Sequence, residues 1–235
     1  MTPASYPNPI LRGPGMPDGV TPPNLYYRFM RLCCHLSMSA FFKIRVFNRH
    51  YEPAKGGAVY ISNHQSFLDP MLMSVALRRP MNYMARDSLF RTPGFRHLIA
   101  SLNAFPVRRG TADTAAMKEA MRRMKAGGQV VVFAEGTRTK DGRVNEFLPG
   151  VALLSQRAAE WTVPVLIDGA YEAWPRENAL PRPGNVVVQY GRPIHRDEAR
   201  KMKAAEFVKS VRQTLIDIQT DVRQRVGRPP LEYKE

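Results

Sequence analysis

The sequence predicts an α/β domain built on a mixed, partly parallel sheet flanked by helices. After residue 50, short runs of β-branched and aromatic residues alternate with segments whose apolar residues recur every three or four positions. This alternation is typical of parallel strands, because each intervening helix returns the chain to the same end of the sheet. With 235 residues, of which 44% are hydrophobic, the chain can build one large domain with a sizeable core.

Each predicted strand is short and rich in residues that favour a pleated, buried surface. QVVVFA at 129–134 has the strongest pattern, and GAVYIS at 57–62 has the continuous apolar character of a strand buried on both faces. The predicted strands span 57–62, 81–85, 104–107, 129–134, 163–170 and 185–191.

The predicted helices follow from apolar stripes and from residues that end a helix. In the segment that starts at residue 111, Met117, Ala120 and Met124 lie on one face, and Gly127 ends the helix. The predicted helices span 69–77, 88–101, 111–126, 150–160 and 197–226, the last as one long helix or two.

Composition divides the chain into three parts. The first is rich in proline and glycine, the second is the most apolar region, and the third contains the alternating strands and helices. The predicted parts are a disordered arm at 1–23, a membrane-associated helical element at 24–47, and a domain at 48–235 with a C-terminal helix from about 197.

The membrane prediction for the second part rests on a strip of basic residues. At helical spacing, Arg28, Arg31 and His35 lie on one side of an otherwise largely apolar helix. Such a strip suits a bilayer interface, where arginines reach toward lipid phosphates. A core helix of the domain is the alternative.

The charge balance indicates an anionic partner. The 35 Lys and Arg residues against 20 Asp and Glu give a formal net charge of +15, which suits nucleic acid, an anionic membrane surface or a phosphorylated substrate. Nucleic acid is not favoured, because the sequence shows no aromatic platform along a basic groove and no signature motif. The adjacent Cys33 and Cys34 form neither a disulfide framework nor a metal-ligand spacing.

The candidate chemistry lies in polar residues at predicted strand ends, since the nucleophile elbow, the P-loop, the dinucleotide fingerprint and the zinc-protease motif are all absent. His64 and Asp69 stand in the stretch NHQSFLDP. A neutral imidazole can take a proton from an alcohol, and a carboxylate on its other nitrogen fixes the tautomer. The pair needs a turn at His64, because five helical positions would point the two side chains about 140° apart. The alternative role of Asp69 is the N-cap of a helix with Pro70 at its first position, and the two roles are compatible.

Two further predicted strand ends contain arginine. In FAEGTRT, Arg138 follows a Glu-Gly turn, and an arginine fork beside free backbone N–H groups binds phosphate well. In FPVRRG, Arg109 is the second of two arginines before a predicted helix, whose N-terminus adds positive potential. The alternatives are a Glu–Arg surface pair and a solvated basic loop.

Taken in order, these blocks resemble the glycerolipid acyltransferases, and specifically the lysophosphatidic acid acyltransferase family. The order is His-x-x-x-x-Asp, Phe-Pro-Val-x-Arg, Glu-Gly-Thr-Arg and a Val-Pro-Val strand, and it covers residues 40–195. The resemblance implies that His64 is the general base, that Asp69 orients it, and that Arg109 helps to bind the acceptor's phosphate. It also implies that one block binds or orients the glycerol phosphate, namely Glu135, Gly136, Thr137 and Arg138.

The resemblance implies an activity as well as a site. The implied reaction moves a fatty acyl group from acyl-CoA or acyl-carrier protein to the free hydroxyl of lysophosphatidic acid, making phosphatidic acid. It implies no metal and no cofactor, and the acyl thioester is a substrate. We expect a membrane-associated protein at the cytoplasmic face of the inner or plasma membrane, in contact with anionic lipid.

One departure from the family pattern leaves the acceptor open. Family members often have a lysine near FLPG at 147–150, where this chain has Leu148 and Pro149. A different lyso-lipid, such as lyso-ornithine lipid, is therefore an alternative acceptor. A non-catalytic membrane protein that binds anionic lipid is the alternative from another functional class.

Overall fold

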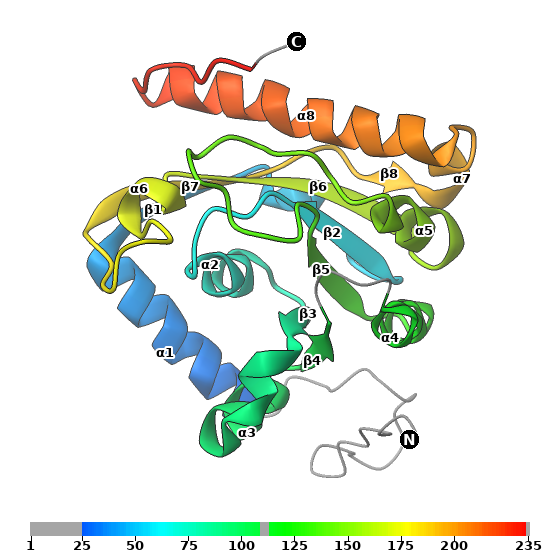
Figure 1. The fold of residues 1–235 in the computed structure, drawn as a ribbon, viewed down its shortest axis with the longest axis horizontal. Helices are drawn as coiled ribbons and strands as arrows, with labels where there is room; N and C mark the ends of the chain where they lie inside the picture. The colour runs from blue at the N-terminus through cyan, green and yellow to red at the C-terminus, as the bar shows by residue number, and fades with distance from the viewer. Residues whose placement is uncertain (1–24, 109–112, 234–235) are drawn as a thin grey trace.

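The computed structural model describes residues 25–108 and 113–233. The predicted arm at 1–23 and the candidate residue Arg109 lie outside these ranges. Within them, helices cover both faces of one sheet (Figure 1), so the predicted α/β fold with a mixed, partly parallel sheet is confirmed.

One sheet of eight strands runs through the described residues. The strands are β1 (Phe42–Phe47), β2 (Ala58–Ser62), β3 (Met81–Arg86), β4 (Ala104–Val107), β5 (Gln129–Phe133), β6 (Trp161–Asp168), β7 (Gly184–Tyr190) and β8 (Ile194–His195). Their order along the sheet is β1-β7-β6-β2-β5-β3-β4, and β8 pairs with β6 beside this path. The central strands β2 and β6 are almost entirely buried, which explains their continuous apolar sequences.

Most neighbouring strands run parallel. β2 pairs in parallel with β5 and β6, and β3 pairs in parallel with β4 and β5. β7 runs antiparallel to β6 and parallel to β1, and β8 is also antiparallel to β6, so β1, β7 and β8 run opposite to the other strands. The carboxyl ends of β2, β5 and β6 therefore meet at one edge of the sheet.

The helices form a layer on each face of the sheet (Figure 1). They are α1 (Leu25–Phe41), α2 (Asp69–Ala76), α3 (Pro93–Ser101), α4 (Thr114–Lys125), α5 (Gly150–Arg157), α6 (Ala170–Ala173), α7 (Arg196–Ala199) and α8 (Ala204–Arg225), with 3-10 turns η2 (Arg49–Tyr51) and η3 (Asp87–Arg91). Val59 and Ile61 of β2 point to one core, which α4, α5, α7 and α8 cover. Ala58 and Tyr60 point to the other core, which α1, α2 and α6 cover.

The prediction of a helical element over 24–47 is wrong in its second part. α1 ends at Phe41, and Phe42–Phe47 forms β1, which pairs with β7 along its whole length. The stretch FKIRVF alternates, because Lys43 and Arg45 are exposed while the aromatic and β-branched residues between them pack inward. This period of two favours a strand, so the domain begins with β1 rather than after it.

α1 is anchored to the domain through Arg31. Its guanidinium donates to the carbonyl oxygens of Leu77 and Arg78, just beyond the end of α2, where helix carbonyls lack partners within the helix. Tyr27 is buried on the same side, and its hydroxyl accepts from the Met81 N–H at 3.3 Å. The predicted strip of arginines facing lipid therefore does not include Arg31. None of the helices in 25–108 and 113–233 has both the length and the apolar character needed to cross a membrane.

The C-terminal segment folds as two helices, α7 and α8, which is one of the two predicted arrangements. Asp168, at the end of β6, is fully buried. It accepts from Arg223 at 3.0 Å, from Gln219 at 3.1 Å and from Arg228. This buried polar network ties α8 and the segment after it to the carboxyl end of β6.

Candidate active site

The candidate site lies where β2 and β5 end side by side. The chain leaves β2 toward α2 on one face of the sheet and leaves β5 toward α5 on the other (Figure 1). In open α/β sheets, ligands bind at the carboxyl ends of strands whose connections diverge in this way. His64 follows β2 and Glu135 follows β5, and the two residues are in contact.

The structure brings His64 and Asp69 together. The His64 Nδ1 lies 2.7 Å from Oδ2 of Asp69, and both side chains are buried. Because a carboxylate only accepts, Nδ1 holds a proton, and in the neutral imidazole the lone pair is then on Nε2. This is the tautomer that a general base requires, and the role of His64 as that base stays a prediction.

The prediction that Asp69 is the N-cap of α2 is wrong. Leu68 is the N-cap, and Asp69 is the first residue of the helix. The Asp69 Oδ2 accepts from the N–H groups of Gln65 and Ser66, at 2.6 and 2.9 Å, in addition to His64. The reason is the tight turn before the helix, which directs its own N–H groups at the carboxylate. Asp69 therefore holds the His64 turn rather than the start of α2.

The loop after β5 fixes the backbone of His64 from the other side. The His64 N–H donates to Oε1 of Glu135 at 3.0 Å, and the His64 carbonyl accepts from the Thr139 N–H at 2.8 Å. The imidazole stacks on Phe133, with ring centres 4.3 Å apart and planes 18° from parallel. The ring is thus held on several sides before any substrate binds, which is the preorganisation that catalysis benefits from.

Glu135 is buried behind His64, and both of its carboxylate oxygens face protein donors. Besides the His64 N–H, the Asn145 side-chain amide donates to Oε2 at 2.7 Å. Burial raises the pKa of Glu135 to about 7, although these hydrogen bonds act to lower it. The contacts of Glu135 are thus with the backbone of His64 and the side chain of Asn145. A role of Glu135 in binding the acceptor stays a prediction.

The next three residues of this loop, Gly136, Thr137 and Arg138, lead from the buried Glu135 to the surface. Gly136 has a φ of 69°, and a Cβ there would lie 2.9 Å from a leucine side chain, so the turn requires glycine. Thr137 is exposed, and the guanidinium carbon of Arg138 lies 3.5 Å from the centre of the Phe67 ring. The turn therefore separates a buried carboxyl from a half-buried arginine that lies against Phe67.

Arg109 lies outside the described residues, so its role in binding phosphate stays a prediction. The residue before it is fixed, because the Arg108 N–H donates to Oδ2 of Asp113 at 2.8 Å. Asp113 also caps α4, since its side chain accepts from the Ala116 N–H at 3.1 Å.

Arg138, in the loop after β5, is a described residue whose chemistry suits an anion. Among residues 25–108 and 113–233, no group of three or more His, Cys, Asp or Glu is arranged to hold a metal ion. Arg138 instead offers planar N–H groups that match the geometry of a phosphate or carboxylate.

A family model described as Acyltransferase matches residues 43–168, which is more than half of the 235 residues. The chain belongs to the acyltransferase family. The match begins in β1 and ends at Asp168, the last residue of β6, so it contains His64, Asp69 and Arg138.

This acyltransferase is similar to proteins named 1-acyl-sn-glycerol-3-phosphate acyltransferase. A chloroplastic one from Arabidopsis thaliana is 29% identical over 173 residues, which cover 72% of this chain and 48% of the relative. One from Bacillus subtilis is 24% identical over 193 residues, which cover 80% of this chain and 92% of the relative. The chain thus spans about half the length of the Arabidopsis relative.

A solved structure supports the fold of this acyltransferase. The crystal structure of the 1-acyl-sn-glycerophosphate (LPA) acyltransferase PlsC from Thermotoga maritima matches with a TM-score of 0.72 at 21% identity. The match covers 89% of this chain and 82% of that chain, so the two proteins share their fold over most of their length.

Two glutamines of the acyltransferase, Gln65 and Gln219, support the site and were not predicted from the sequence. Both donate to the carbonyl oxygen of Gly142, at 2.8 and 3.0 Å respectively, and both are fully buried. Through them α8 is linked to the His64 turn. The signal for Gln219 is its place between Leu215 and Val222 in the apolar stripe of α8, where a polar residue needs a buried partner.

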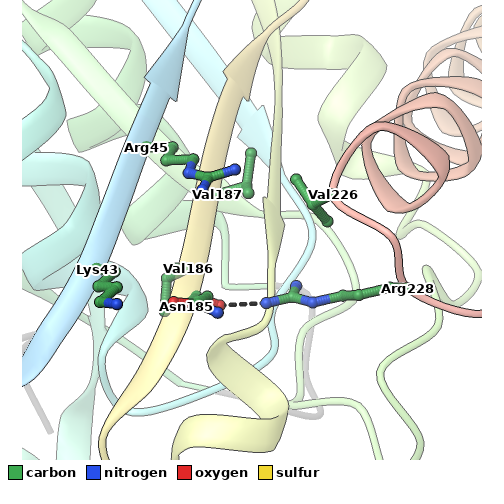
Figure 2. A pocket seen from close by; sticks show the side chains of 7 residues that line it. All are labelled: Lys43, Arg45, Asn185, Val186, Val187, Val226 and Arg228. Atoms are coloured by element: carbon green, nitrogen blue, oxygen red, sulfur yellow. Dashed lines mark hydrogen bonds between the residues drawn. The ribbon is translucent and has the colours of Figure 1, made fainter.

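The hollow in Figure 2 is not part of the acyltransferase site. It has a volume of about 50 Å³ and lies between β1, β7 and the segment after α8, with Lys43, Arg45 and Arg228 among its lining residues. Arg228 already pairs with Asp168 and donates to the Asn185 carbonyl, as the dashed line in Figure 2 shows for the second contact. β6 and β7 separate β1 from β2 in the sheet, which places the hollow at an edge of the sheet and away from His64.

Proposed function

We propose that the protein transfers a fatty acyl group from an acyl thioester to the free hydroxyl of lysophosphatidic acid, making phosphatidic acid. The observation that supports this most directly is the His64–Asp69 pair, with Nδ1 and Oδ2 2.7 Å apart, within a chain of the acyltransferase family. The names of the relatives from Arabidopsis thaliana and Bacillus subtilis support the choice of acceptor.

In the proposed step, Nε2 of His64 accepts the proton of the acceptor hydroxyl while the hydroxyl oxygen attacks the thioester carbonyl carbon. An ester C–O bond forms, and collapse of the tetrahedral intermediate breaks the C–S bond. The proton then passes from Nε2 to the departing sulfur, so the thiol product is neutral and no electrons are gained or lost overall. Asp69 stabilises the imidazolium that exists between the two proton transfers.

The loop after β5 supports binding of a phosphorylated acceptor. The half-buried Arg138 lies three residues beyond the buried Glu135, and a guanidinium binds phosphate through paired, charge-assisted hydrogen bonds. By resemblance, Arg109 makes a second phosphate contact, and Thr137 adds a hydroxyl. We propose either acyl-CoA or acyl-carrier protein as the donor, since a thioester is common to both.

The exposed side of α1 supports a position at a membrane surface. Leu25, Phe29 and Leu36 are 83%, 60% and 60% exposed, whereas Tyr27 and Met38 of the same helix are buried against the domain. A helix with large apolar side chains on its outer side lies in the bilayer interface, and net positive charge attracts anionic lipid. We place this surface at the cytoplasmic face of the inner or plasma membrane.

The membrane part of the proposal is tested by changing the exposed residues alone. Replacing Leu25, Phe29 and Leu36 together by serine should release the protein from liposomes containing anionic lipid, measured by sedimentation. The fold should be unchanged, because these side chains lie outside the core. Liposome binding equal to that of the wild type would show that a different surface holds the membrane. Deleting residues 1–47 is a poorer test, because it removes β1 from the sheet.

The activity is tested with purified protein, labelled acyl-CoA or acyl-carrier protein, and a panel of lyso-lipid acceptors with product identification. Lysophosphatidic acid should be the preferred acceptor, and the panel includes lyso-ornithine lipid because Leu148 stands where family members often have lysine. His64→Ala should lower turnover by about 10²- to 10⁴-fold. His50→Ala is the matched control, because His50 lies exposed in η2, before β2, at the opposite end of that strand from the site.

Two results would contradict the proposal in different ways. If His64→Ala is folded and retains most of its turnover, the assignment of the base is wrong. If the wild type consumes no thioester with any lyso-lipid, a non-catalytic lipid-binding protein is favoured instead.

A further inference from the structure

We infer that Phe67 is a positioning residue that holds Arg138 in the orientation needed to bind the anionic group of the acceptor. This inference rests on the proposed function, in which Arg138 binds the acceptor's phosphate. It assigns a role to the exposed aromatic residue of the His64 turn, which neither the base nor its carboxylate partner explains.

The two residues come from different loops and are in cation–π contact. Phe67 lies three residues after His64, whereas Arg138 lies in the loop after β5. The Arg138 guanidinium carbon is 3.5 Å from the centre of the Phe67 ring, which is well inside the range of a cation–π contact. Phe67 is 50% exposed, so hydrophobic burial alone does not account for a phenylalanine at this position.

Phe67 is itself held in place by a third loop. Its ring lies 5.4 Å from that of Trp174, with the planes 52° apart, and Trp174 follows α6 after β6. Ser66 Oγ donates to the Trp174 carbonyl at 2.9 Å, and the Trp174 indole N–H donates to the Asn178 carbonyl at 2.9 Å. Trp174, Phe67 and Arg138 therefore contact one another in that order, and each comes from a loop at the carboxyl end of a different central strand.

The contact between Phe67 and Arg138 should affect the binding of the acceptor more than the rate of the chemical step. Arginine has a long, flexible side chain, and contact with an aromatic face restricts the positions of its guanidinium. A guanidinium that lies flat on a ring keeps its N–H groups in its own plane, where they suit a phosphate. Because Phe67 belongs to the same turn as His64, its contact with Arg138 also fixes the position of the guanidinium relative to the base.

The test compares Phe67→Leu with Phe67→Tyr, measuring KM for the acceptor, KM for the donor and kcat. Leucine keeps an apolar side chain but has no ring face, whereas tyrosine keeps the ring. We expect Phe67→Leu to raise the acceptor KM by about 3- to 10-fold, from the usual strength of a cation–π contact. Donor KM and kcat should stay near the wild-type values, and Phe67→Tyr should behave like the wild type.

A matched control removes a similar contact elsewhere. Phe47, at the end of β1, has the Arg225 guanidinium carbon 5.0 Å from its ring centre, far along the sheet from His64. Phe47→Leu should leave the acceptor KM unchanged. A rise equal to that of Phe67→Leu would show a general loss of stability and would overturn the inference.

The double variant Phe67→Leu/Arg138→Ala shows whether Phe67 acts through Arg138. If it does, Phe67→Leu has no further effect on acceptor KM once Arg138 is alanine. An equal effect in both backgrounds would overturn the inference, because Phe67 would then act independently of Arg138.

The two single variants separate this inference from the proposed function. If Arg138→Ala raises acceptor KM but Phe67→Leu does not, the inference alone fails. If Arg138→Ala changes neither acceptor KM nor kcat, the proposed phosphate anchor fails and the inference fails with it.

Discussion

Replacing Glu135 by glutamine should change how the stability of the protein depends on pH. The wild-type carboxyl is buried, and its oxygens accept from the His64 N–H and the Asn145 amide. Glutamine keeps a carbonyl oxygen for the His64 N–H and can pair with Asn145 after that amide rotates, but it does not titrate.

The size of the effect follows from the pKa of Glu135, which burial raises from 4.5 to about 7. Between these two values the folded protein binds more protons than the unfolded chain, so the stability of the wild type falls as pH rises through this window. At about 1.4 kcal/mol per pH unit, the loss from this one group amounts to about 3 kcal/mol above pH 7. Because glutamine does not titrate, the stability of Glu135→Gln does not fall for this reason. The variant should therefore become more stable relative to the wild type as pH rises.

Urea unfolding at pH 5, 6, 7 and 8 measures the effect as the difference in unfolding free energy between variant and wild type. Other titrating groups are common to both proteins and cancel in that difference. The difference should move in favour of the variant by about 2 to 3 kcal/mol from pH 5 to pH 8. Glu177→Gln, at an exposed carboxylate, controls for the loss of one negative charge. A difference that stays constant with pH would refute the reasoning, because Glu135 would then have the same pKa in both states.

Two further substitutions test the network around the site. Asp69→Asn keeps an oxygen for the Gln65 and Ser66 N–H groups but removes the charge beside His64, so kcat should fall by about 10²- to 10⁴-fold with little change in melting temperature. A large loss of stability with unchanged kcat per folded molecule would show that Asp69 is purely structural. Asp168→Ala removes the buried carboxylate beside Arg223 and leaves the half-exposed Glu172 as its carboxylate partner among the described residues, so urea unfolding should show a loss of about 3 kcal/mol. A loss below about 1 kcal/mol would mean that the buried ion pair contributes little.

The sequence predicted most of the central sheet because its strands have a strong local signal. β5 and β6 are runs of β-branched residues, and a sheet covered on both faces requires such runs. β1 was missed because FKIRVF continues the apolar composition of the helix before it. Its partner, β7, is distant in sequence, and no local pattern identifies so remote a pairing.

The His64–Asp69 contact was predictable, whereas the way Asp69 makes it was not. The spacing indicated a turn before a helix, and such a turn is what the structure has. A proline-containing helix start suggested an N-cap, but the N–H groups of Gln65 and Ser66 took the carboxylate oxygen instead. Which N–H groups reach the Asp69 carboxylate depends on the backbone conformation of the turn, and residue types alone do not determine that conformation.

The pairing of β1 with β7 sets the order in which the molecule can be completed during synthesis. β1 ends at Phe47, and its partner does not begin until Gly184. At about 5 to 20 residues per second, the ribosome needs roughly 7 to 30 s to make the intervening chain. Throughout that time the edge of β1 lacks β7, and α1, with Leu25 and Phe29 on its exposed side, emerges from the ribosome before β7 is made. A lipid surface or a chaperone therefore has access to α1 before the sheet closes behind it.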